Sequence, residues 1–210
     1  MIKINKGNVP REFYEAKKNH NHYDELYKDE KDKLKAILLK EQNNRCAYCN
    51  RGIDLETSTI EHYIPRNGKN GDPSMSLDYN NLFAVCEVTR HLPPEQQTCD
   101  VKRGDKLLQI DPRNQNHIDT IKYNKRGIIS SNNNAFDDDL NRKLNLNAQA
   151  LIESRVTAFD TLIKGMAKRK NGKFSKDLIQ RTLKIYKAKD NCTPYVGYII
   201  YRLEDRLKRF

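Results

Sequence analysis

The sequence of 210 residues contains no tryptophan and no run of 18 apolar residues. A membrane-spanning helix needs about 20 predominantly apolar residues, so no membrane span is expected. The opening residues MIKINKG lack the apolar stretch of a secretory signal, which argues against ordinary export and predicts a cytoplasmic location. There is also no internal repeat and no phosphate loop of the form G-x-x-x-x-G-K, so energy from ATP would have to come from elsewhere.

Positive charge is concentrated in the second half of the chain. Residues 1–105 contain 17 basic and 17 acidic residues, whereas residues 106–210 contain 22 basic and 11 acidic residues. The whole formal excess of +11 therefore lies in the second half. Such an asymmetry favours a polyanionic partner, because each cation set against a phosphate releases counterions. Charge alone thus indicates nucleic acid as the class of partner.

The densest basic stretch is Lys164 to Lys176, which contains no acidic residue. A solvated helix end and loop would show the same composition, so this alternative stays open beside nucleic-acid binding. If the stretch contacts nucleic acid, the candidate side chains are Lys168, Arg169, Lys170 and Lys173.

Five cysteines, an odd number without an export signal, indicate reduced thiols rather than a disulfide framework. Cys46 and Cys49 form a C-x2-C knuckle, a spacing that lets two thiolates reach one tetrahedral ion from a tight turn. Cys86 and Cys99 are the candidates for the other two ligands, although twelve residues separate them. Small buried core thiols are the alternative interpretation. Cys192 lies in a separate turn and has no candidate partner.

Two short strands are predicted between these cysteines. Ser58 to Ile64 is rich in β-branched and aromatic residues and is ended by Pro65. Leu82 to Val85 is the second apolar run. Between them, the segment Asn67 to Pro73 is rich in turn residues that neither a strand nor a helix would keep.

The order of these motifs resembles the HNH endonuclease family. It reads C-x2-C, then E-H-x-x-P, then N-L-x-x-x-C, then C-D-x-K. The resemblance implies an α+β fold with a ββα-metal core, also called the HNH or His-Me finger, clamped by a structural Zn²⁺. The usual zinc-bearing form has a second C-x2-C pair, so this chain carries ten extra residues before Cys99. We interpret the extra residues as a loop that leaves both ligands in place.

The residue types agree with the chemistry that such a family performs. Hydrolysis of a phosphodiester needs a base that activates water, a cation that stabilises developing charge, and a scaffold that positions both. His62 is the candidate base, because an imidazole with a pKa of about 6.5 is neutral at cellular pH. Glu61 precedes it on the same strand, so the two side chains should point to opposite faces unless the backbone kinks at Pro65. The resemblance nevertheless implies that Glu61 binds the catalytic metal.

The resemblance implies roles for three further residues. Asp100 stands where the family has its final His or Asn, and its carboxylate would bind Mg²⁺ or Mn²⁺. Asn81 would orient His62 by tying the connecting loop to the strand, with Asn80 as the alternative. Lys102 stands at the family's lysine position, where it could contact a phosphate or remain a solvated helix residue.

Helical and hairpin patterns flank this region. Asp24 to Gln42 has apolar residues at helical spacing and should pack against the zinc-bound core. Ile118 to Ile129 predicts a β-hairpin with Gly127 in its turn. Asp137 to Asp139 would suit a helix N-terminus, where acids complement the helix dipole, and an acidic metal cluster is the alternative.

Two apolar stripes predict a helical subdomain towards the C-terminus. One runs from Ile152 to Met166 and the other from Val196 to Phe210, each in steps of four and three residues. Packing of the stripes in one core is the simplest interpretation. The alternative leaves the last stripe exposed for a partner protein.

Over the whole chain, the sequence resembles more narrowly the PtuB-type HNH endonucleases of Septu anti-phage systems, which also occur with retrons. The motifs are K-G-x-x-P from Lys6, T-C-D-x-K-x-G-D from Thr98, and L-N-L-N from Leu144 before a helix containing Arg155. These flanking motifs are less specific than the nuclease motif. The resemblance implies an effector that degrades nucleic acid and is held by a PtuA-like ABC-type ATPase, with a retron reverse transcriptase and its msDNA as further partners.

The sequence thus predicts an N-terminal helical flank (1–42), a zinc-knuckle nuclease core (43–108) and a basic C-terminal hairpin with a helical subdomain (109–210). The expected function is metal-dependent cleavage of DNA. Cleavage of RNA, for example transfer RNA, is one alternative, because only a 2′-OH contact would discriminate the two substrates. A zinc-stabilised binding module without catalysis is the other.

Overall fold

The computed structural model describes residues 1–169 and 174–210 and combines helices with two small sheets. The helices are α1 (Arg11–Lys17), α2 (Lys28–Glu41), α3 (Cys99–Arg103), α4 (Gln115–Asp119), α5 (Asn134–Asp138), α6 (Gln149–Arg169), α7 (Lys176–Tyr186) and α8 (Val196–Leu207). The strands are β1 (Ser58–His62), β2 (Leu82–Cys86), β3 (Ile121–Tyr123) and β4 (Ile129–Ser131). This mixed helix and strand composition confirms the predicted α+β class.

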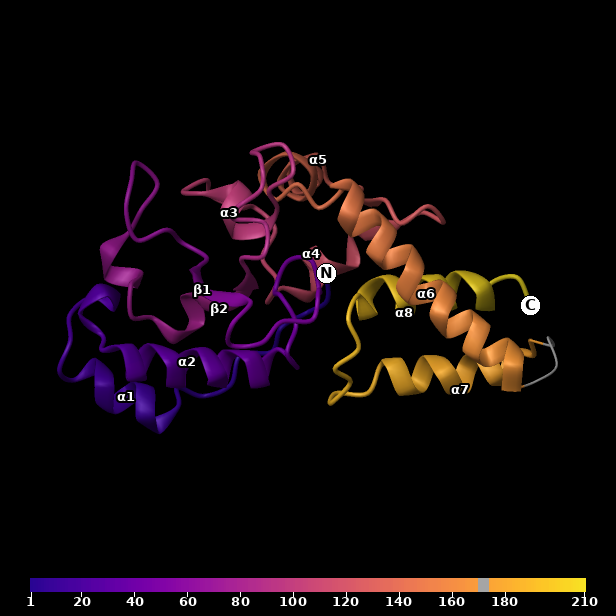
Figure 1. Ribbon diagram of the computed structural model, residues 1–210, viewed down its shortest axis with the longest axis horizontal. Coiled ribbons are helices and arrows are strands. Elements are labelled where there is room, and N and C mark those ends of the chain that lie inside the picture. Colours follow the sequence, from indigo (N-terminus) through magenta and orange to yellow (C-terminus); the bar gives the residue numbers. More distant parts are fainter. Residues whose placement is uncertain (170–173) are drawn as a thin grey trace.

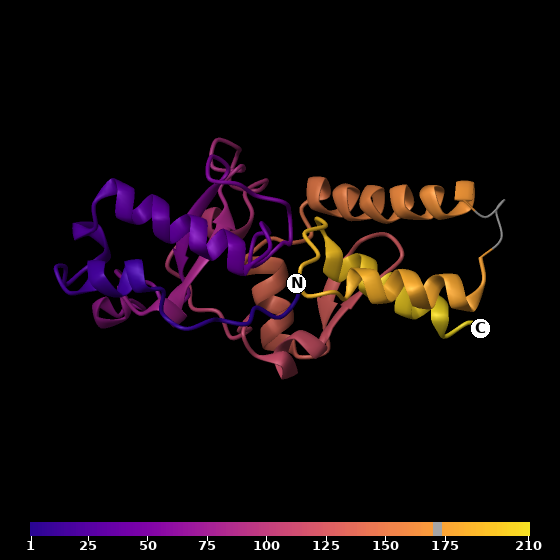
Figure 2. The ribbon, with the colours of Figure 1, turned by 90° about the horizontal axis from the view of Figure 1, so that it is seen from below.

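Figures 1 and 2 show an elongated molecule with α1, α2, β1 and β2 towards one end and α6, α7 and α8 at the other. The N-terminus lies between these two ends in both views. Within the described residues, no helix has both the length and the apolar sequence needed to cross a membrane.

The first sheet is the antiparallel pair of β1 and β2, which confirms both predicted strands. Ser58 lies opposite Cys86, and His62 lies opposite Leu82. Every residue of β2 is buried, as expected for a strand rich in apolar side chains. Helix α2 covers this sheet with Leu34 and Leu38, which are fully buried, so the predicted packing of the first long helix against the core is confirmed.

The N-terminal flank differs from the prediction of one helix over Asp24–Gln42. Helix α2 begins at Lys28 because the Tyr27 backbone N–H donates to the Glu30 carboxylate, an N-terminal cap that stops the helix from extending backwards. The residues before it form a separate 3₁₀ turn, Tyr23–Glu25. Helix α1 was not predicted, because only two of its side chains are buried and a helical stripe is therefore absent.

The ten extra residues before Cys99 form a loop that is fastened by the L-N-L-N motif. The Cys99 backbone N–H donates to the Leu144 carbonyl over 2.9 Å. Asn145 adopts a left-handed backbone conformation, with φ of 50°, and its side-chain amide donates to the carbonyls of Glu95 and Gln97, both over 2.9 Å. A segment far along the chain thereby holds the loop and the start of α3.

The second sheet is the predicted hairpin of β3 and β4. Gly127 lies in its turn with φ of 85°, and a Cβ there would come within 2.7 Å of the Ile152 carbonyl oxygen. Ile118 belongs to α4 rather than to a strand. Arg155 donates to the carbonyls of Gly127 and Leu146, so α6 anchors both the turn and the L-N-L-N segment.

The C-terminal helices pack together, as the apolar stripes predict. Phe159 and Met166 of α6 are buried, and so are Val196 and Leu203 of α8. Phe210, at the end of the second predicted stripe, is 61% exposed and lies beyond α8. Mutual packing therefore accounts for most of both stripes.

The three consecutive aspartates do not act together at one helix N-terminus. Asp137 lies in the first turn of α5, but Asp139 is buried at the start of a π-helical turn, Asp139–Lys143. The Asp139 carboxylate accepts from the Ile110 backbone N–H over 2.8 Å and pairs with Lys143 over 2.6 Å. Asp139 therefore accepts hydrogen bonds from buried backbone N–H groups of a distant segment, and the local sequence does not reveal this contact.

Candidate functional site

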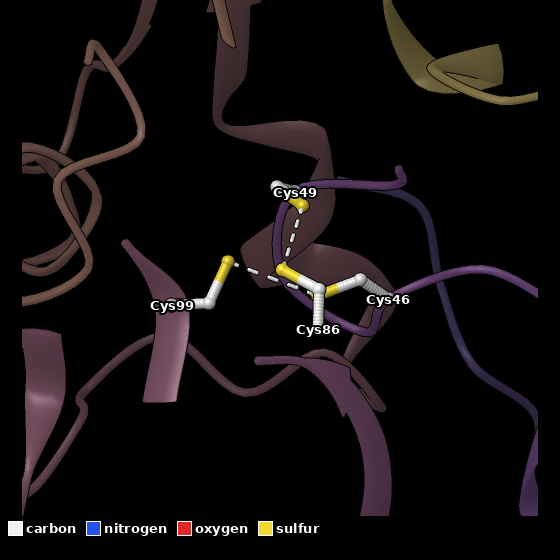
Figure 3. Close-up of side chains that lie close together, drawn as sticks. All are labelled: Cys46, Cys49, Cys86 and Cys99. Carbon is white, nitrogen blue, oxygen red and sulfur yellow. Dashed lines mark hydrogen bonds between the residues drawn. The ribbon is translucent and has the colours of Figure 1, made fainter. Parts of the chain in front are cut away.

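Four cysteines from separate segments meet in one buried cluster. Cys46 and Cys49 lie after α2, Cys86 ends β2, and Cys99 begins α3. Their sulfur atoms all lie within 4.8 Å of one another, with 3.8 Å between those of Cys46 and Cys99 and 3.7 Å between those of Cys49 and Cys86. Figure 3 shows the four side chains converging on one point. The cluster could therefore hold a metal ion.

Backbone hydrogen bonds fix the knuckle that carries the first two thiols. The Cys46 N–H donates to the Arg51 carbonyl, and the Ala47 N–H donates to the Ala84 carbonyl in β2. Hydrogen bonds shared among the four thiols hold the pKa of Cys49 well below its ordinary value and raise the pKa of Cys86 and of Cys99, so one thiol of the metal-free cluster is favoured as thiolate. A thiolate is the form that ligates a cation. Cys192 is exposed and does not join the cluster.

Glu61 and Asp100 lie together on one side of β1. Glu61 is 6% exposed, and its Oε1 accepts a hydrogen bond from the Tyr48 hydroxyl over 2.9 Å and another from Arg103. Burial raises the pKa of Glu61 to about 8, and the neighbouring Asp100 carboxylate adds to this rise against the opposing effect of Arg103. Two carboxyl groups this close disfavour a second negative charge unless a cation lies between them.

His62 faces the other side of the strand. Its Nε2 lies 3.0 Å from the Ser76 carbonyl, and its ring meets the Tyr23 ring edge-on with 4.8 Å between centroids. Burial lowers the pKa of His62 to about 4, so the imidazole is neutral at neutral pH. Because a carbonyl only accepts, Nε2 carries the proton and Nδ1 keeps its lone pair. The side chains of Glu61 and His62 thus alternate across β1, as expected for neighbours on a strand.

Asn81 ties together the two ends of the loop between β1 and β2. Its side-chain oxygen accepts from the Ile64 N–H over 2.7 Å, and its amide donates to the carbonyls of Ile64 and Met75 over 3.0 and 3.1 Å. The residue is 1% exposed. Asn80, the alternative, is exposed and makes no comparable side-chain bonds within the described structure.

Two side chains that sequence reasoning missed complete the surroundings of Glu61. Tyr48 lies inside the C-x2-C knuckle, and Arg103 ends α3; both are fully buried. Local sequence gives one weak signal for each, since Tyr48 is the large residue of a tight metal knuckle and Arg103 stands within T-C-D-x-K-x-G-D. Their contact with Glu61 joins segments 13 and 42 residues away along the chain.

The basic residues predicted to bind nucleic acid occupy two places. The Lys102 ammonium group donates to the Pro94 carbonyl over 2.8 Å, on the face of α3 that meets the inserted loop. Lys168 is exposed near the end of α6, and Arg169 is the last residue of that helix. Lys170 and Lys173 lie outside the described residues. Figure 1 shows the end of α6 at the opposite end of the molecule from β1.

Two curated proteins are similar to parts of this chain, and no protein-family model matches it. One relative, from Vibrio cholerae serotype O1 biovar El Tor, is named as the HNH endonuclease of retron Vc95, an activity that its name marks as inferred. It is 30% identical over 71 residues, which are 34% of this chain and 33% of the relative. The other is Septu protein PtuB of Bacillus thuringiensis, 27% identical over 96 residues, 45% of this chain and 35% of the relative.

These names confirm the resemblance that the motifs predict, to HNH endonucleases of retrons and Septu systems. The chain spans about a third of the length of the curated relatives it matches.

Proposed function

We propose that this protein is a metal-dependent HNH endonuclease that hydrolyses phosphodiester bonds of DNA. The observation that carries the proposal is the meeting of two carboxyl groups, Glu61 and Asp100, on one face of the end of β1, with the neutral, buried His62 on the other face. The relatives named as an HNH endonuclease and as PtuB support it independently.

The four-cysteine cluster has the dimensions of a structural zinc site. Zn–S bonds of about 2.3 Å in a tetrahedron place neighbouring sulfurs about 3.8 Å apart. The two sulfur pairs of the cluster lie 3.8 and 3.7 Å apart. Four thiolates leave no open position, as in zinc sites that stabilise a fold rather than catalyse. Zn²⁺ held by Cys46, Cys49, Cys86 and Cys99 would therefore fix β2 and α3 together.

Glu61 and Asp100 suit a hard divalent cation. Oxygen ligands of this kind favour Mg²⁺ or Mn²⁺. Burial and the nearby Asp100 raise the pKa of Glu61, so a bound cation would stabilise the ionised form of both carboxyl groups. Such a cation, when bound, stabilises the charge that develops on the phosphate oxygens and the leaving group. Arg103 supplies one positive charge beside this carboxyl pair, and a divalent cation would supply the charge that lets both groups ionise.

His62 is the proposed general base. The Ser76 carbonyl holds the imidazole by Nε2, so that Nδ1 would accept the proton of the attacking water. Asn81 keeps the loop that carries Ser76 closed onto β1 through its bond to Met75. Because His62 and Glu61 lie on opposite faces of the strand, we propose that the phosphodiester docks across the end of β1 and reaches both.

The biological setting is proposed from the relatives. PtuB belongs by name to a Septu system and the other relative to a retron, so we propose that this chain acts in anti-phage defence. A PtuA-like ABC-type ATPase would be its partner, and in a retron also the reverse transcriptase with its msDNA. Co-expression with the neighbouring ATPase, followed by copurification through a tag on the nuclease, tests this assignment.

The activity is tested by incubating the purified chain with supercoiled plasmid and, in parallel, with total RNA, in Mg²⁺ or Mn²⁺ and in EDTA. We expect metal-dependent plasmid nicking that falls by about 10²–10⁴-fold in His62→Ala. His117→Ala, which changes a histidine of α4, is the matched control and should retain activity. Equal nicking by the wild type and His62→Ala would refute the assignment of the base, and cleavage of RNA alone would replace DNA as the substrate.

A further inference from the structure

We infer that Tyr48 and Arg103 are positioning residues that hold the Glu61 carboxylate in place for the catalytic cation, an inference that rests on the proposed function. Neither residue would touch the substrate. Each would act through Glu61, by fixing one carboxylate oxygen so that the other is presented to the metal.

Arg103 joins α3 to the end of β1. One terminal nitrogen donates to Glu61 Oε1 and to the His62 carbonyl, the latter over 3.1 Å, and the other donates to the Tyr63 carbonyl. Its Nε donates to the Lys106 carbonyl over 2.8 Å. The guanidinium therefore binds two consecutive backbone carbonyls, those of His62 and Tyr63, as well as the side chain of Glu61.

Arg103 also shares a short helix with two metal ligands. Helix α3 begins with Cys99, continues with Asp100 and ends with Arg103. A residue three positions along a helix lies on the same side as the first, so Asp100 and Arg103 both face Glu61. The same helix thus links the thiol cluster, the second carboxylate and the group that orients the first carboxylate.

Tyr48 reaches the same oxygen from the thiol knuckle. Its hydroxyl donates to Glu61 Oε1 over 2.9 Å and accepts from Arg103 over 3.2 Å, and its side chain has no exposed surface. Two donors therefore occupy Oε1, and the Glu61 carboxyl also meets the Asp100 carboxyl, its hydrogen-bond partner. The remaining Glu61 oxygen is the one that a cation shared with Asp100 would bind.

The energetic argument favours a role beyond packing. The Arg103 guanidinium and the Tyr48 hydroxyl hold one oxygen of Glu61, so this carboxyl cannot rotate away from Asp100. Residues that orient a metal ligand in this way usually change the metal affinity by about 10–100-fold. A buried ion pair kept only for stability would gain little over an apolar pair of the same volume. The contacts of Tyr48 and Arg103 converge instead on the one side chain that the nuclease proposal assigns to the metal.

Two conservative variants test the inference, each with a matched control from the other half of the chain. Tyr48→Phe removes one hydroxyl. Tyr198→Phe removes the hydroxyl of another buried tyrosine, which accepts from an arginine but donates to a backbone carbonyl instead of a carboxylate. Arg103→Lys keeps the positive charge but removes the planar guanidinium with its several donors. Arg155→Lys makes the same change at a buried arginine that binds two carbonyls. Mn²⁺ affinity by calorimetry, zinc content, melting temperature and plasmid nicking are measured on all four.

We expect Tyr48→Phe and Arg103→Lys to weaken Mn²⁺ binding by about 10–100-fold while retaining one zinc per chain. The controls should stay within twofold of the wild type in Mn²⁺ affinity. Mn²⁺ affinity unchanged in folded Tyr48→Phe would overturn the inference, even if Arg103→Lys fails to fold. Wild-type protein that binds Mn²⁺ through Glu61 but cleaves no nucleic acid would refute the proposed function and leave the positioning role standing, whereas wild type without Mn²⁺ binding would refute both.

Discussion

His62 is held neutral by its surroundings, and this has a consequence for stability. Burial lowers the pKa of His62 to about 4, whereas an unfolded histidine titrates at about 6.5. Between these two values the unfolded chain binds a proton that the folded chain does not. The free energy of unfolding therefore falls as the pH drops from about 6.5 to 4, and the contribution of His62 is fully present only above about 6.5.

His62→Gln should remove this acid sensitivity, because glutamine cannot titrate but can still donate to the Ser76 carbonyl. Urea unfolding of both proteins from pH 4 to pH 7 measures the effect. The stability of the wild type relative to the variant should decrease by roughly 3 kcal/mol over this range. The raised pKa of Glu61 acts in both proteins and cancels in the comparison. If the free energies of unfolding of the two proteins change in parallel with pH, the His62 imidazole is not buried in the way that the structure indicates.

Glu61 predicts that metal binding, like the stability contribution of His62, strengthens as the pH rises. With a pKa raised to about 8, its carboxyl is protonated at neutral pH in the metal-free chain, so a bound cation must displace a proton. Mn²⁺ affinity should therefore increase by up to about tenfold for each unit by which the pH rises towards 8, and it should level off above pH 8. Calorimetric titrations at pH 6, 7 and 8.5 measure this slope, and Glu61→Gln is the control in which the slope should vanish. A flat affinity in the wild type would contradict the raised pKa.

Candidate site residues could be proposed from the sequence where the expected chemistry follows from a local motif. The cysteine spacing and the E-H-x-x-P string point to Cys46, Cys49 and His62 without any structure. Tyr48 and Arg103 were not predictable, because their meaning lies in a contact with Glu61 that only the folded chain creates. A buried arginine has the same local sequence appearance as a solvated one, so its partner decides its role.

The inserted loop before Cys99 shows how a distant element can hold a candidate metal ligand in place. Asn145 holds the loop by two amide hydrogen bonds and also occupies a left-handed conformation, which asparagine tolerates better than alanine. Asn145→Ala should lower the free energy of unfolding by about 2–3 kcal/mol, through lost hydrogen bonds and backbone strain.

Asn145→Gly separates these two causes. Glycine adopts the left-handed conformation freely but makes no side-chain hydrogen bond, so it should cost only about 1–2 kcal/mol. Urea unfolding of the zinc-loaded proteins measures both values. Equal stability of the wild type and Asn145→Ala would show that the loop does not depend on this residue.

The thiol cluster predicts how the elements around it respond to loss of the metal. Cys99→Ser should reduce bound zinc from about one ion per chain and destabilise the contact between β2 and α3, because a closed zinc site contributes folding free energy. Cys192→Ser changes an exposed thiol outside the cluster and should keep both zinc and melting temperature. Elemental analysis measures the zinc content, and thermal unfolding measures the melting temperature of each variant. Full zinc occupancy in Cys99→Ser would exclude this thiol as a ligand.

Strands and long helices followed from sequence more closely than short helices did. β1 and β2 lie where β-branched and apolar runs predicted them, and the stripes of α6 and α8 fixed both helices to within a few residues. The start of α2 was misplaced because a side-chain cap at Glu30 outweighed helical composition. The short helix α1 carries too few buried residues for any periodic signal, and its position depends on tertiary packing.

In the whole molecule, the candidate catalytic residues and the basic residues of α6 lie in different places. The candidate catalytic residues lie with β1 and α3, whereas the basic α6 extends towards the opposite end (Figure 1). The division into regions at residues 42 and 108 stays a prediction. If nucleic acid binds along this length, the basic helix would act as a second contact that tethers the substrate without taking part in hydrolysis.

Lys164 and Lys168 test this second contact, because both are exposed on α6 and neither is paired with an acidic side chain in the described structure. Replacing both with glutamine should weaken DNA binding and lower the slope of log K against log salt by about two, since each lysine that meets a phosphate releases about one counterion. Fluorescence anisotropy between 50 and about 300 mM salt measures the slope.

The matched control replaces Lys18 and Lys33, which are equally exposed but already paired with Glu15 and Asp29. It removes the same formal charge from the other end of the chain and should leave the slope within about half a unit, because those lysines release few counterions. Nicking at saturating DNA should be unchanged in both double variants, since none of the four lysines makes a hydrogen bond to Glu61 or His62 in the described structure. If the two double variants lower the slope equally, net charge rather than a defined surface on α6 governs binding, and the tethering role of this helix is wrong.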